Sequence, residues 1–448
     1  MCKIPFSGGW RLAGGSCQCL VCRERVGKLL YNIFIMKKLF FILLSVWMLA
    51  QARSQTSAGF GTVLVESSNP DYESLPVINL RSSDYLTVSF DDLQDRDMAL
   101  RYRVVHLNTD GTLSPLREIE YMDGINKTDI TDVNLSFNTR TNYVHYEFRF
   151  PEGRRNVKVS GAFCFEIFEA SDPGNVMLRI PFMVCEPSVL VDVDVKAPRR
   201  VEWRMSRQEL AVVVDASECP YRILQADRTL KVFAQQNQNT ATIRQLPMLF
   251  QVGTRYEYRD KDEMVFDGLS EFRNFDIRPV EHSGWGVETT YILRDRWNAL
   301  LLRQKSREYK PYIQDDDING NYAVKAERMD NSAIEAEYVD VRFLLEGVEP
   351  AEGMDIYVVG KFNNWECSEA SKMAYIPDMK LYSATLPLKQ GFYDYMYACV
   401  ENGRVDMPRL EGNNQETEND YFVYVFYREP GGRYDRLLGV VKANSRDI

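Results

Sequence analysis

A short run at 360–366, GKFNNWE, holds the residue types best suited to binding a sugar. It follows an apolar stretch at 356–359, which places it just after a strand. Aromatic rings stack on sugar rings, while amide and ammonium groups bond to sugar hydroxyls. The alternative is structural, with the tryptophan packed in the core and the asparagine pair shaping the turn. The candidate ligand or partner contacts are Lys361, Phe362, Asn363, Asn364 and Trp365.

A second run, QDDDINGN at 314–321, copies the start of a calcium-binding loop. Its first, third and fifth loop positions are Asp315, Asp317 and Asn319. The twelfth position is Ala326, whereas a calcium loop needs a glutamate there to supply two oxygens. A turn held by Asx side chains is therefore the preferred interpretation, and no metal site is expected.

No constellation for catalysis is recognisable. The histidines, His106, His145 and His282, lie in separate segments with no second histidine at metal-ligand spacing, so we expect structural roles. The sequence lacks the G-x-S-x-G and H-E-x-x-H motifs and a phosphate-binding glycine loop. Carboxylates are abundant, but a glycosidase pair must face each other across a cleft. We expect no enzyme activity, no catalytic residue and no cofactor.

Composition favours a β-rich globular chain. Hydrophobic residues make up 45 % and aromatic residues 12 % of the sequence. The length of 448 residues exceeds what one hydrophobic core normally organises, so two or three domains are expected. The net charge of −10 argues against nucleic acid as a partner, because phosphates require clustered lysines and arginines.

The N-terminal part is expected to direct export. Residues 1–52 read as an upstream extension followed by a secretory signal peptide at 36–52, with a lysine pair, an apolar run and an A-Q-A cleavage site. Translation from Met1 and from Met36 both fit. Later apolar runs fall short of the ~20 residues of a transmembrane helix, and no cysteine for a lipid anchor adjoins the cleavage site. Export into the periplasm without a lipid anchor is the expectation.

A long hairpin between Asn134 and Glu169 gives the clearest strand signal. Apolar and polar residues alternate from Tyr143 to Phe150, a Pro- and Gly-containing turn follows, and an aromatic strand runs from 161 to 169. The best helical candidate is 294–308. The predicted buried side of the first strand comprises Val144, Tyr146, Phe148 and Phe150, and the opposite side comprises Tyr143, His145, Glu147 and Arg149.

Strand and turn signals continue along the whole chain, which predicts an all-β protein of tandem immunoglobulin-like β-sandwich domains. The expected boundaries are 56–186 for the first sandwich, 187–330 for a second β-rich domain and 331–448 for a C-terminal immunoglobulin-like (E-set) sandwich.

Five cysteines follow the expected cleavage site, an odd number at wide spacings. This is not a disulfide framework. Cys164 and Cys185 lie in apolar strand patterns and are expected to be buried as small hydrophobic residues. A pairing of Cys367 with Cys399 remains open.

Several long segments of strand and turn residues stand out along the chain after the signal peptide. The segments are YRVVHLN at 102–108, EYMDGIN at 120–126, SFNT at 136–139, NYVHYEFRFPE at 142–152, VSGAF at 159–163, QQNQN at 235–239, EFRNFDI at 271–277, LEGNNQETENDYFVYVFYR at 410–428 and YDRLLG at 434–439. Together they resemble the plug-protein family of the Bacteroidetes type IX secretion system. They occur in the family's order and cover nearly all of the chain after the signal peptide.

The resemblance implies a non-enzymatic plug that closes the periplasmic mouth of the type IX secretion translocon, a very large outer-membrane β-barrel. It implies a location in the periplasm at the inner side of the outer membrane, held there by protein contact, with no oligomer expected. The C-terminal domain is also similar to glycogen-binding-type β-sandwich modules through the GKFNNWE run. The alternative function is therefore a periplasmic glycan-binding protein.

Overall fold

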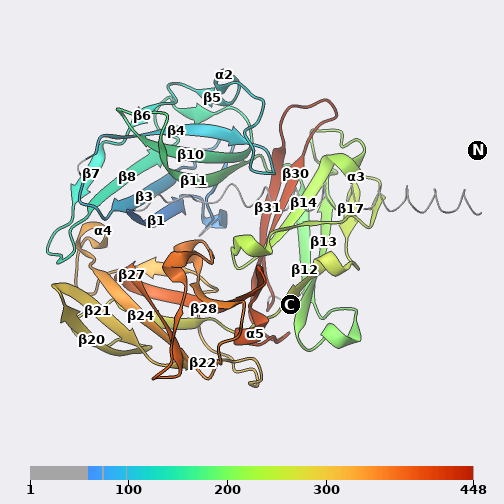
Figure 1. Cartoon of the computed structure of the whole chain (residues 1–448). Helices are drawn as coiled ribbons and strands as arrows, with labels where there is room; N and C mark the ends of the chain where they lie inside the picture. Colours follow the sequence, from blue (N-terminus) through green and yellow to red (C-terminus); the bar gives the residue numbers. More distant parts are fainter. Residues whose placement is uncertain (1–58, 73–74, 97, 447–448) are drawn as a thin grey trace, which may run out of the picture. The chain divides into compact units, whose positions relative to one another are not determined.

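The computed structural model describes residues 59–72, 75–96 and 98–446, so the expected signal peptide and upstream extension at 1–52 lie outside it. The described chain forms three β-sandwiches with only short helices between strands, as Figure 1 shows. The predicted all-β architecture of tandem sandwiches is confirmed. Within the described residues, no helix has the length and apolar character needed to cross a bilayer.

The first sandwich packs two antiparallel sheets around an aromatic core. One sheet has the order β1-β3-β8-β7 and the other β2-β11-β10-β4-β6, in which only β2 runs parallel to its neighbour. Its elements are β1 Phe60–Ser67, η2 Pro70–Tyr72, β2 Val77–Asn79, β3 Leu86–Asp92, β4 Leu100–Leu107, α2 Glu118–Tyr121, β5 Met122–Asp123, β6 Thr128–Asp129, β7 Asp132–Leu135, β8 Val144–Phe150, β9 Asn156–Val157, β10 Gly161–Glu169 and β11 Val176–Cys185.

The two predicted strands appear as β8 and β10, but the predicted hairpin is wrong. β8 pairs with β3 and β7 in one sheet, whereas β10 pairs with β4 and β11 in the other, because the chain crosses between the sheets after Phe150. The side of β8 that was expected to face the core is buried, but Tyr143 and His145 on the other side are buried as well. Tyr143 donates a 2.9 Å hydrogen bond to the backbone oxygen of Ala336 in the third sandwich. The beginning of this second face is therefore covered by another sandwich, which the alternating pattern did not reveal, whereas Arg149 at its end is exposed as expected.

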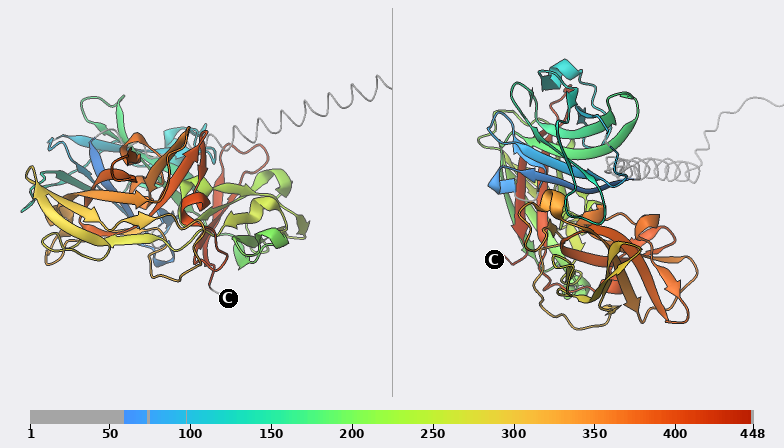
Figure 2. Two further views of the ribbon diagram at one scale, coloured as in Figure 1. Left: turned by 60° about the horizontal axis from the view of Figure 1, so that its bottom comes forward. Right: turned by 90° about the vertical axis from the view of Figure 1, so that its left-hand side faces the viewer.

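The second sandwich is completed by the C-terminal strands of the chain. One sheet has the order β12-β13-β17-β16, with β18 also pairing with β13, and the other has the order β15-β14-β30-β31. Figure 2 shows the dark-red strands β30 and β31 beside the green strand β14. Its elements are β12 Leu190–Lys196, η3 Val201–Trp203, β13 Arg207–Asp215, α3 Ala226–Thr229, β14 Leu230–Gln236, η4 Thr240–Thr242, β15 Arg244–Leu246, β16 Phe250–Val252, β17 Arg255–Tyr258, η5 Asp262–Met264, β18 Val265–Asp267, β30 Asp420–Tyr427 and β31 Arg436–Asn444.

The third sandwich uses the segment between these two parts. β28 is the centre of one sheet and pairs with β19, β23, β25 and β29, while the other sheet has the order β20-β21-β24-β27-β26 with β22 beside β24. Its elements are β19 Arg273–Asp276, β20 Val287–Leu293, β21 Arg296–Leu301, β22 Gln304–Lys305, β23 Tyr322–Val324, α4 Ser332–Glu335, β24 Tyr338–Glu346, β25 Met354–Val359, η6 Lys361–Asn363, η7 Glu369–Ser371, β26 Ala374–Ile376, β27 Leu381–Lys389, β28 Gly391–Glu401, β29 Arg404–Asp406 and α5 Pro408–Glu411.

These pairings divide the chain differently from the boundaries 187–330 and 331–448. β19 to β23 belong to the third sandwich, whose core includes Phe275 and Leu301. β30 and β31 return to the second sandwich, whose core includes Tyr421 and Leu438. The physical reason is a pairing between distant segments, β14 with β30, which leaves no local signal in the sequence.

The helix expected at 294–308 is wrong, because this segment forms β21 and β22. Arg294 and Asp295 both have a positive φ, 52° and 60°, in the two-residue turn that joins β20 to β21. Two such residues are typical of the tight hairpin turn that matches strand twist. Buried Ala299 and Leu301 then pack into the core from β21, so tertiary pairing overrides the local helical pattern.

The cysteines behave as small core residues. Cys164 and Cys185 are buried, as expected. Cys399 is buried in β28 with a free thiol, so the open pairing with Cys367 is not formed.

Candidate functional site

The GKFNNWE run forms the turn that follows β25. Asn363 closes this turn, since its side-chain oxygen accepts a hydrogen bond of 3.0 Å from the Gly360 N–H and its amide donates one of 2.9 Å to the Val358 oxygen. The Lys361 ammonium donates a 2.8 Å hydrogen bond to Asn321 Oδ1, and burial lowers its pKa to about 8. The backbone oxygen of Asn364 accepts a hydrogen bond from Thr240 of the second sandwich.

Trp365 does not offer a platform for a sugar ring. Its side chain is 6 % exposed and packs against Phe272, with ring centroids 5.7 Å apart. Phe362 is partly buried against Tyr393. The structural alternative therefore describes this run: the tryptophan lies in the core and the asparagines shape the turn.

The run 314–321 folds as an Asx turn, as its sequence indicated. Asp317 Oδ1 accepts a 2.9 Å hydrogen bond from the Asn319 N–H. Its other oxygen accepts one from the Phe272 N–H, so backbone donors occupy both oxygens. The loop also wraps around the buried Asp394, which accepts hydrogen bonds from the N–H groups of Ile318 and Gly320. Burial and the nearby Asp317 carboxylate raise the pKa of Asp394 to about 8.

The three histidines lie in different environments. His106 is buried in the first sandwich, where its Nε2 lies 3.3 Å from the Ser160 oxygen, and burial lowers its pKa to about 4. His145 is buried against Asp91. His282 is exposed, 3.8 Å from Glu327. Within the described part of the chain, no group of three or more His, Cys, Asp or Glu residues is arranged to hold a metal ion.

The polar side chains that do gather lie where the sandwiches meet. Between the first and the third sandwich, Asp91 on β3 is 1 % exposed, and both of its carboxylate oxygens contact polar side chains. Oδ1 lies 2.7 Å from His145 Nδ1, and Oδ2 accepts 2.7 Å bonds from the Lys389 ammonium and the Tyr338 hydroxyl. Lys389 also lies 4.2 Å from the centroid of the Tyr143 ring. Burial lowers the pKa of Lys389, while the Asp91 carboxylate opposes that change.

Between the first and the second sandwich the central group is Asp435. It accepts hydrogen bonds from Arg428 at 2.6 and 2.9 Å and from the Thr109 hydroxyl at 3.0 Å, and it lies 3.4 Å from the Lys231 ammonium. Burial alone would raise the pKa of Asp435, but Arg428 and Lys231 hold it below its usual range. Thr109 belongs to the first sandwich and the two cations to the second, so this carboxylate joins the two.

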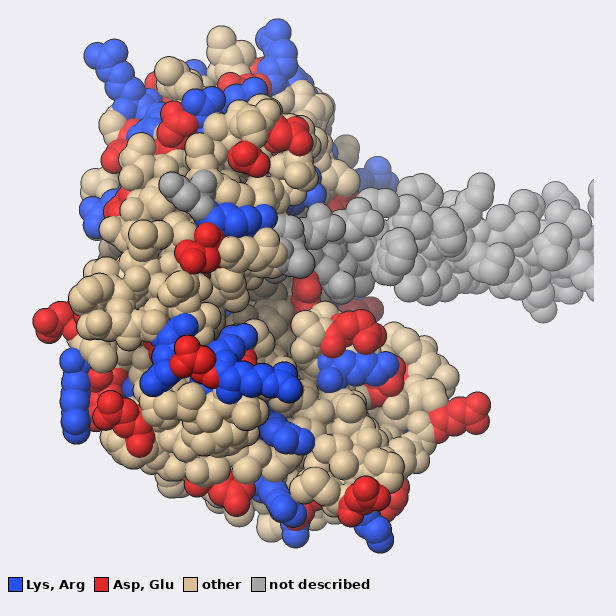
Figure 3. All heavy atoms as spheres, turned by 60° about the vertical axis from the view of Figure 1, so that its left-hand side comes forward, with Lys and Arg blue, Asp and Glu red and all other residues tan. Residues whose placement is uncertain are grey.

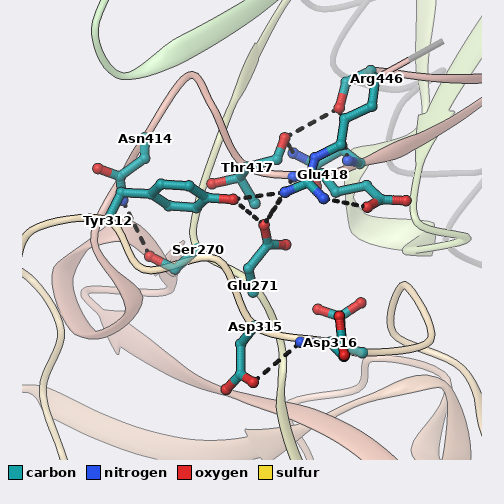
Figure 4. Close-up of polar contacts among 12 residues, drawn as sticks. Ser270, Glu271, Tyr312, Asp315, Asp316, Asn414, Thr417, Glu418 and Arg446 are labelled. Carbon is teal, nitrogen blue, oxygen red and sulfur yellow. Dashed lines mark hydrogen bonds and ion pairs between the residues drawn. The ribbon is translucent and has the colours of Figure 1, made fainter.

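Between the second and the third sandwich, Figure 4 shows Glu271, Tyr312 and Arg446 pointing toward one another. The Arg446 guanidinium donates 2.8 Å hydrogen bonds to Glu271 Oε1, to the Tyr312 hydroxyl and to Glu418 Oε2. The Tyr312 hydroxyl also donates to Glu271. Burial raises the pKa of Glu271, and its hydrogen bonds oppose the change. The three sites between sandwiches are called junctions below.

The junction residues were missed by sequence analysis. Asp91 stands at the end of an apolar strand and Lys389 at the end of another, where charges normally face solvent. Each lies on the side of its strand opposite to the alternating core residues, so the sequence pattern predicts exposure and gives no signal for burial. The arrangement can hold sandwiches rigidly together, because each charge is paired and hydrogen-bonded.

The face drawn in Figure 3 carries no large patch of a single charge sign. Basic and acidic side chains lie there in mixed groups between neutral residues. Salt bridges of the exposed type, such as Arg101 with Asp129 and Lys158 with Asp123, also mix the two signs.

Comparison with known proteins links the chain to a secretion system. Residues 61–186 match the family model described as the type 9 secretion system plug protein 1st domain. This range coincides with the first sandwich from β1 to the end of β11. No curated protein matches the sequence.

The whole fold recurs in a solved structure. A crystal structure of a hypothetical protein from Parabacteroides merdae ATCC 43184 at 2.30 Å resolution has a TM-score of 0.82 and 28 % identity, over 87 % of this chain and 98 % of that one. The structure of activated Escherichia coli alpha-2-macroglobulin has 10 % identity over 86 % of this chain and 30 % of that one, and its TM-score of 0.18 carries no argument. The first sandwich therefore belongs to the family of first domains of type 9 (type IX) secretion system plug proteins.

Proposed function

We propose that the chain is a non-enzymatic plug that closes the periplasmic mouth of the outer-membrane translocon of the type 9 secretion system. The observation that carries the proposal is the match of residues 61–186 to the first domain of the plug family. A periplasmic location at the inner side of the outer membrane follows from the same role.

The junctions support this role physically. A barrel wide enough for folded proteins leaks unless something fills it. Filling a wide pore requires a body that keeps its shape, and three sandwiches on flexible linkers would not do so. Asp91, Asp435 and Glu271 each join two sandwiches through buried hydrogen-bonded charges, which favours one rigid body.

Two exposed apolar edges support contact with a partner protein. β7 and β20 are edge strands of the first and third sandwiches. Leu135 and Phe137 are 67 % and 58 % exposed, and Leu293 at the end of β20 is exposed as well. Arg140 and Asp295 form an ion pair that links the two segments. Apolar side chains on free sheet edges are a hazard for a soluble protein unless a partner covers them.

The test is a pull-down of the tagged full-length chain from mildly solubilised outer membranes of its native host. We expect a giant β-barrel protein in amounts comparable to the bait. Absence of the barrel, in cells shown to produce it, would contradict the proposal.

A paired variant sharpens this test. Replacing Leu135 and Phe137 together by Asp should reduce recovery of the barrel, because it places charge on the apolar edge. The control is Met205→Asp, which changes an even more exposed apolar residue of the second sandwich and should leave recovery unchanged. Equal recovery with all three proteins would remove this edge from the contact while leaving the plug role to the first experiment.

A further inference from the structure

A cavity of about 250 Å³ opens beside the junction of Figure 4, on the side of Ser270, Glu271 and Asp315. Its wall includes four cationic side chains, those of Arg273, Lys305, Arg307 and Lys310, although the chain as a whole is acidic.

Two of these cations are neutralised by acids of the protein. The buried Arg273 guanidinium lies 3.0 Å from Glu411, and Lys305 lies 3.2 Å from Glu346. The buried Glu411 carboxylate also accepts a 2.7 Å hydrogen bond from the Tyr397 N–H. No acid is left over from these pairs.

Arg307 is not neutralised in the same way. Its guanidinium donates one 2.7 Å hydrogen bond, to the backbone oxygen of Glu271, and forms no ion pair with any residue between 59 and 446 that the structure describes. Burial and the neighbouring Arg273 cation lower the pKa of Arg307, while Glu411 and Asp315 oppose the change. Lys310 likewise has no ion-pair partner in the described chain, and its backbone N–H is bonded to Arg307.

The lining holds charges of both signs, and its two cations without an ion pair lie among carboxylates. Arg307 and Lys310 contribute two positive charges, and Asp315, which also lines the cavity, contributes one negative charge without reaching ion-pair distance. The Glu271 carboxylate lines the cavity too, and its partner Arg446 is shared with Glu418, so the acids of the lining favour a ligand with little negative charge. A carboxylate group carries one negative charge and matches the planar fork of a guanidinium, whereas a phosphate brings nearly two.

We propose that this cavity binds a carboxylate group, held by Arg307 and Lys310. The cavity has room for a side chain or a small organic acid, so the carboxylate comes from a free acid or from an acidic residue of a partner protein. This inference does not depend on the proposed function.

The test uses the full chain without its signal peptide and two probes at constant ionic strength. Glutarate binding is followed by calorimetry, and binding of a fluorescein-labelled tri-glutamate peptide by fluorescence anisotropy. We expect Arg307→Gln to weaken binding at least tenfold and Asp315→Asn to tighten it several-fold, because the latter removes the opposing charge. Arg404→Gln, which changes an exposed arginine of β29, should have no effect.

Lys310→Gln is a second variant that keeps the test valid if Arg307→Gln does not fold, since this exposed side chain contributes charge and little packing. It should weaken binding several-fold with an unchanged melting temperature. Tighter binding of glutarate than of the peptide would identify a free acid, and the reverse would identify a partner residue. Inorganic phosphate at the same ionic strength should bind more weakly than glutarate. Unchanged affinity in both Arg307→Gln and Lys310→Gln, or no binding of either probe to the parent protein, would overturn the proposal.

Discussion

The Lys389 ammonium of the third sandwich lies 2.7 Å from the Asp91 carboxylate of the first, and both side chains are almost completely buried. Such a pair is costly to break, because removal of one partner leaves an uncompensated buried charge.

Lys389→Met should therefore lower the free energy of unfolding by about 3–5 kcal/mol, as measured by chemical denaturation. The additional change Asp91→Asn should recover part of this loss, since it removes the stranded charge. Lys158→Met breaks an exposed pair with Asp123 and should cost less than about 1 kcal/mol. Equal losses for Lys389→Met and Lys158→Met would mean that the junction contributes no more than a surface pair.

Gly161 lies at the close approach between the first sandwich and the β30–β31 hairpin. Its φ is +132°, and a Cβ at this position would lie 2.7 Å from the backbone oxygen of Asp435. Gly161→Ala should cost at least about 2 kcal/mol, from strain and from displacement of the hairpin. Gly153→Ala is the control, because its φ is also positive but nothing lies within 4 Å, and should cost about 1 kcal/mol. Similar melting temperatures for both variants would argue against tight contact here.

His106 should make the protein less stable in acid. Burial lowers its folded pKa to about 4, below the ordinary value of 6.5, so the unfolded chain takes up the proton first as the pH falls. Its contribution to stability is complete above pH 6.5 and is lost progressively toward pH 4, on the order of 3 kcal/mol in all.

Denaturation of the parent and of His106→Phe at pH 7 and pH 5 tests this sign. Phenylalanine keeps the ring packed against Phe163 and cannot be protonated. The loss of stability between the two pH values should be smaller in the variant. An identical pH dependence would show that His106 does not titrate in this range.

Trp365→Ala should act on stability and not on sugar binding. The side chain is buried against Phe272, so its removal leaves a cavity and should lower the free energy of unfolding by about 3–5 kcal/mol. Trp285 is 67 % exposed, and Trp285→Ala should cost less than about 1 kcal/mol. In affinity electrophoresis, we expect an α-glucan gel to leave the mobility of the parent protein unchanged. Retardation that depends on Trp365 would restore the glycan-binding alternative.

Sequence analysis predicted the fold where the signal is local. The alternation from Val144 to Phe150 and the aromatic run from Gly161 to Glu169 appear as β8 and β10, although these strands lie in different sheets and not in the predicted hairpin. It did not predict that β14 pairs with β30, nearly two hundred residues further along the chain. Strand pairing at such distances depends on tertiary contacts that no local pattern records.

The same limit applies to the candidate site. Asn363 and Trp365 were correctly placed in a turn after a strand, but whether the ring faces solvent or Phe272 depends on β19 and the 314–321 loop, which arrive from elsewhere. The sequence neighbours of Asp91, Asp435 and Arg307 give no sign that these charged residues make buried polar contacts. Only the fold brings them close to their contacts, which come from distant parts of the chain.

The most direct test of the plug role is the permeability of the outer membrane in the native host. A strain lacking the chain should admit a large hydrophilic antibiotic faster than the parent strain, and removal of the translocon barrel as well should restore the barrier. Expression of the full chain should also restore it, whereas the destabilised Lys389→Met chain should do so less well. Unchanged permeability in the strain that lacks the chain but produces the barrel would contradict the account.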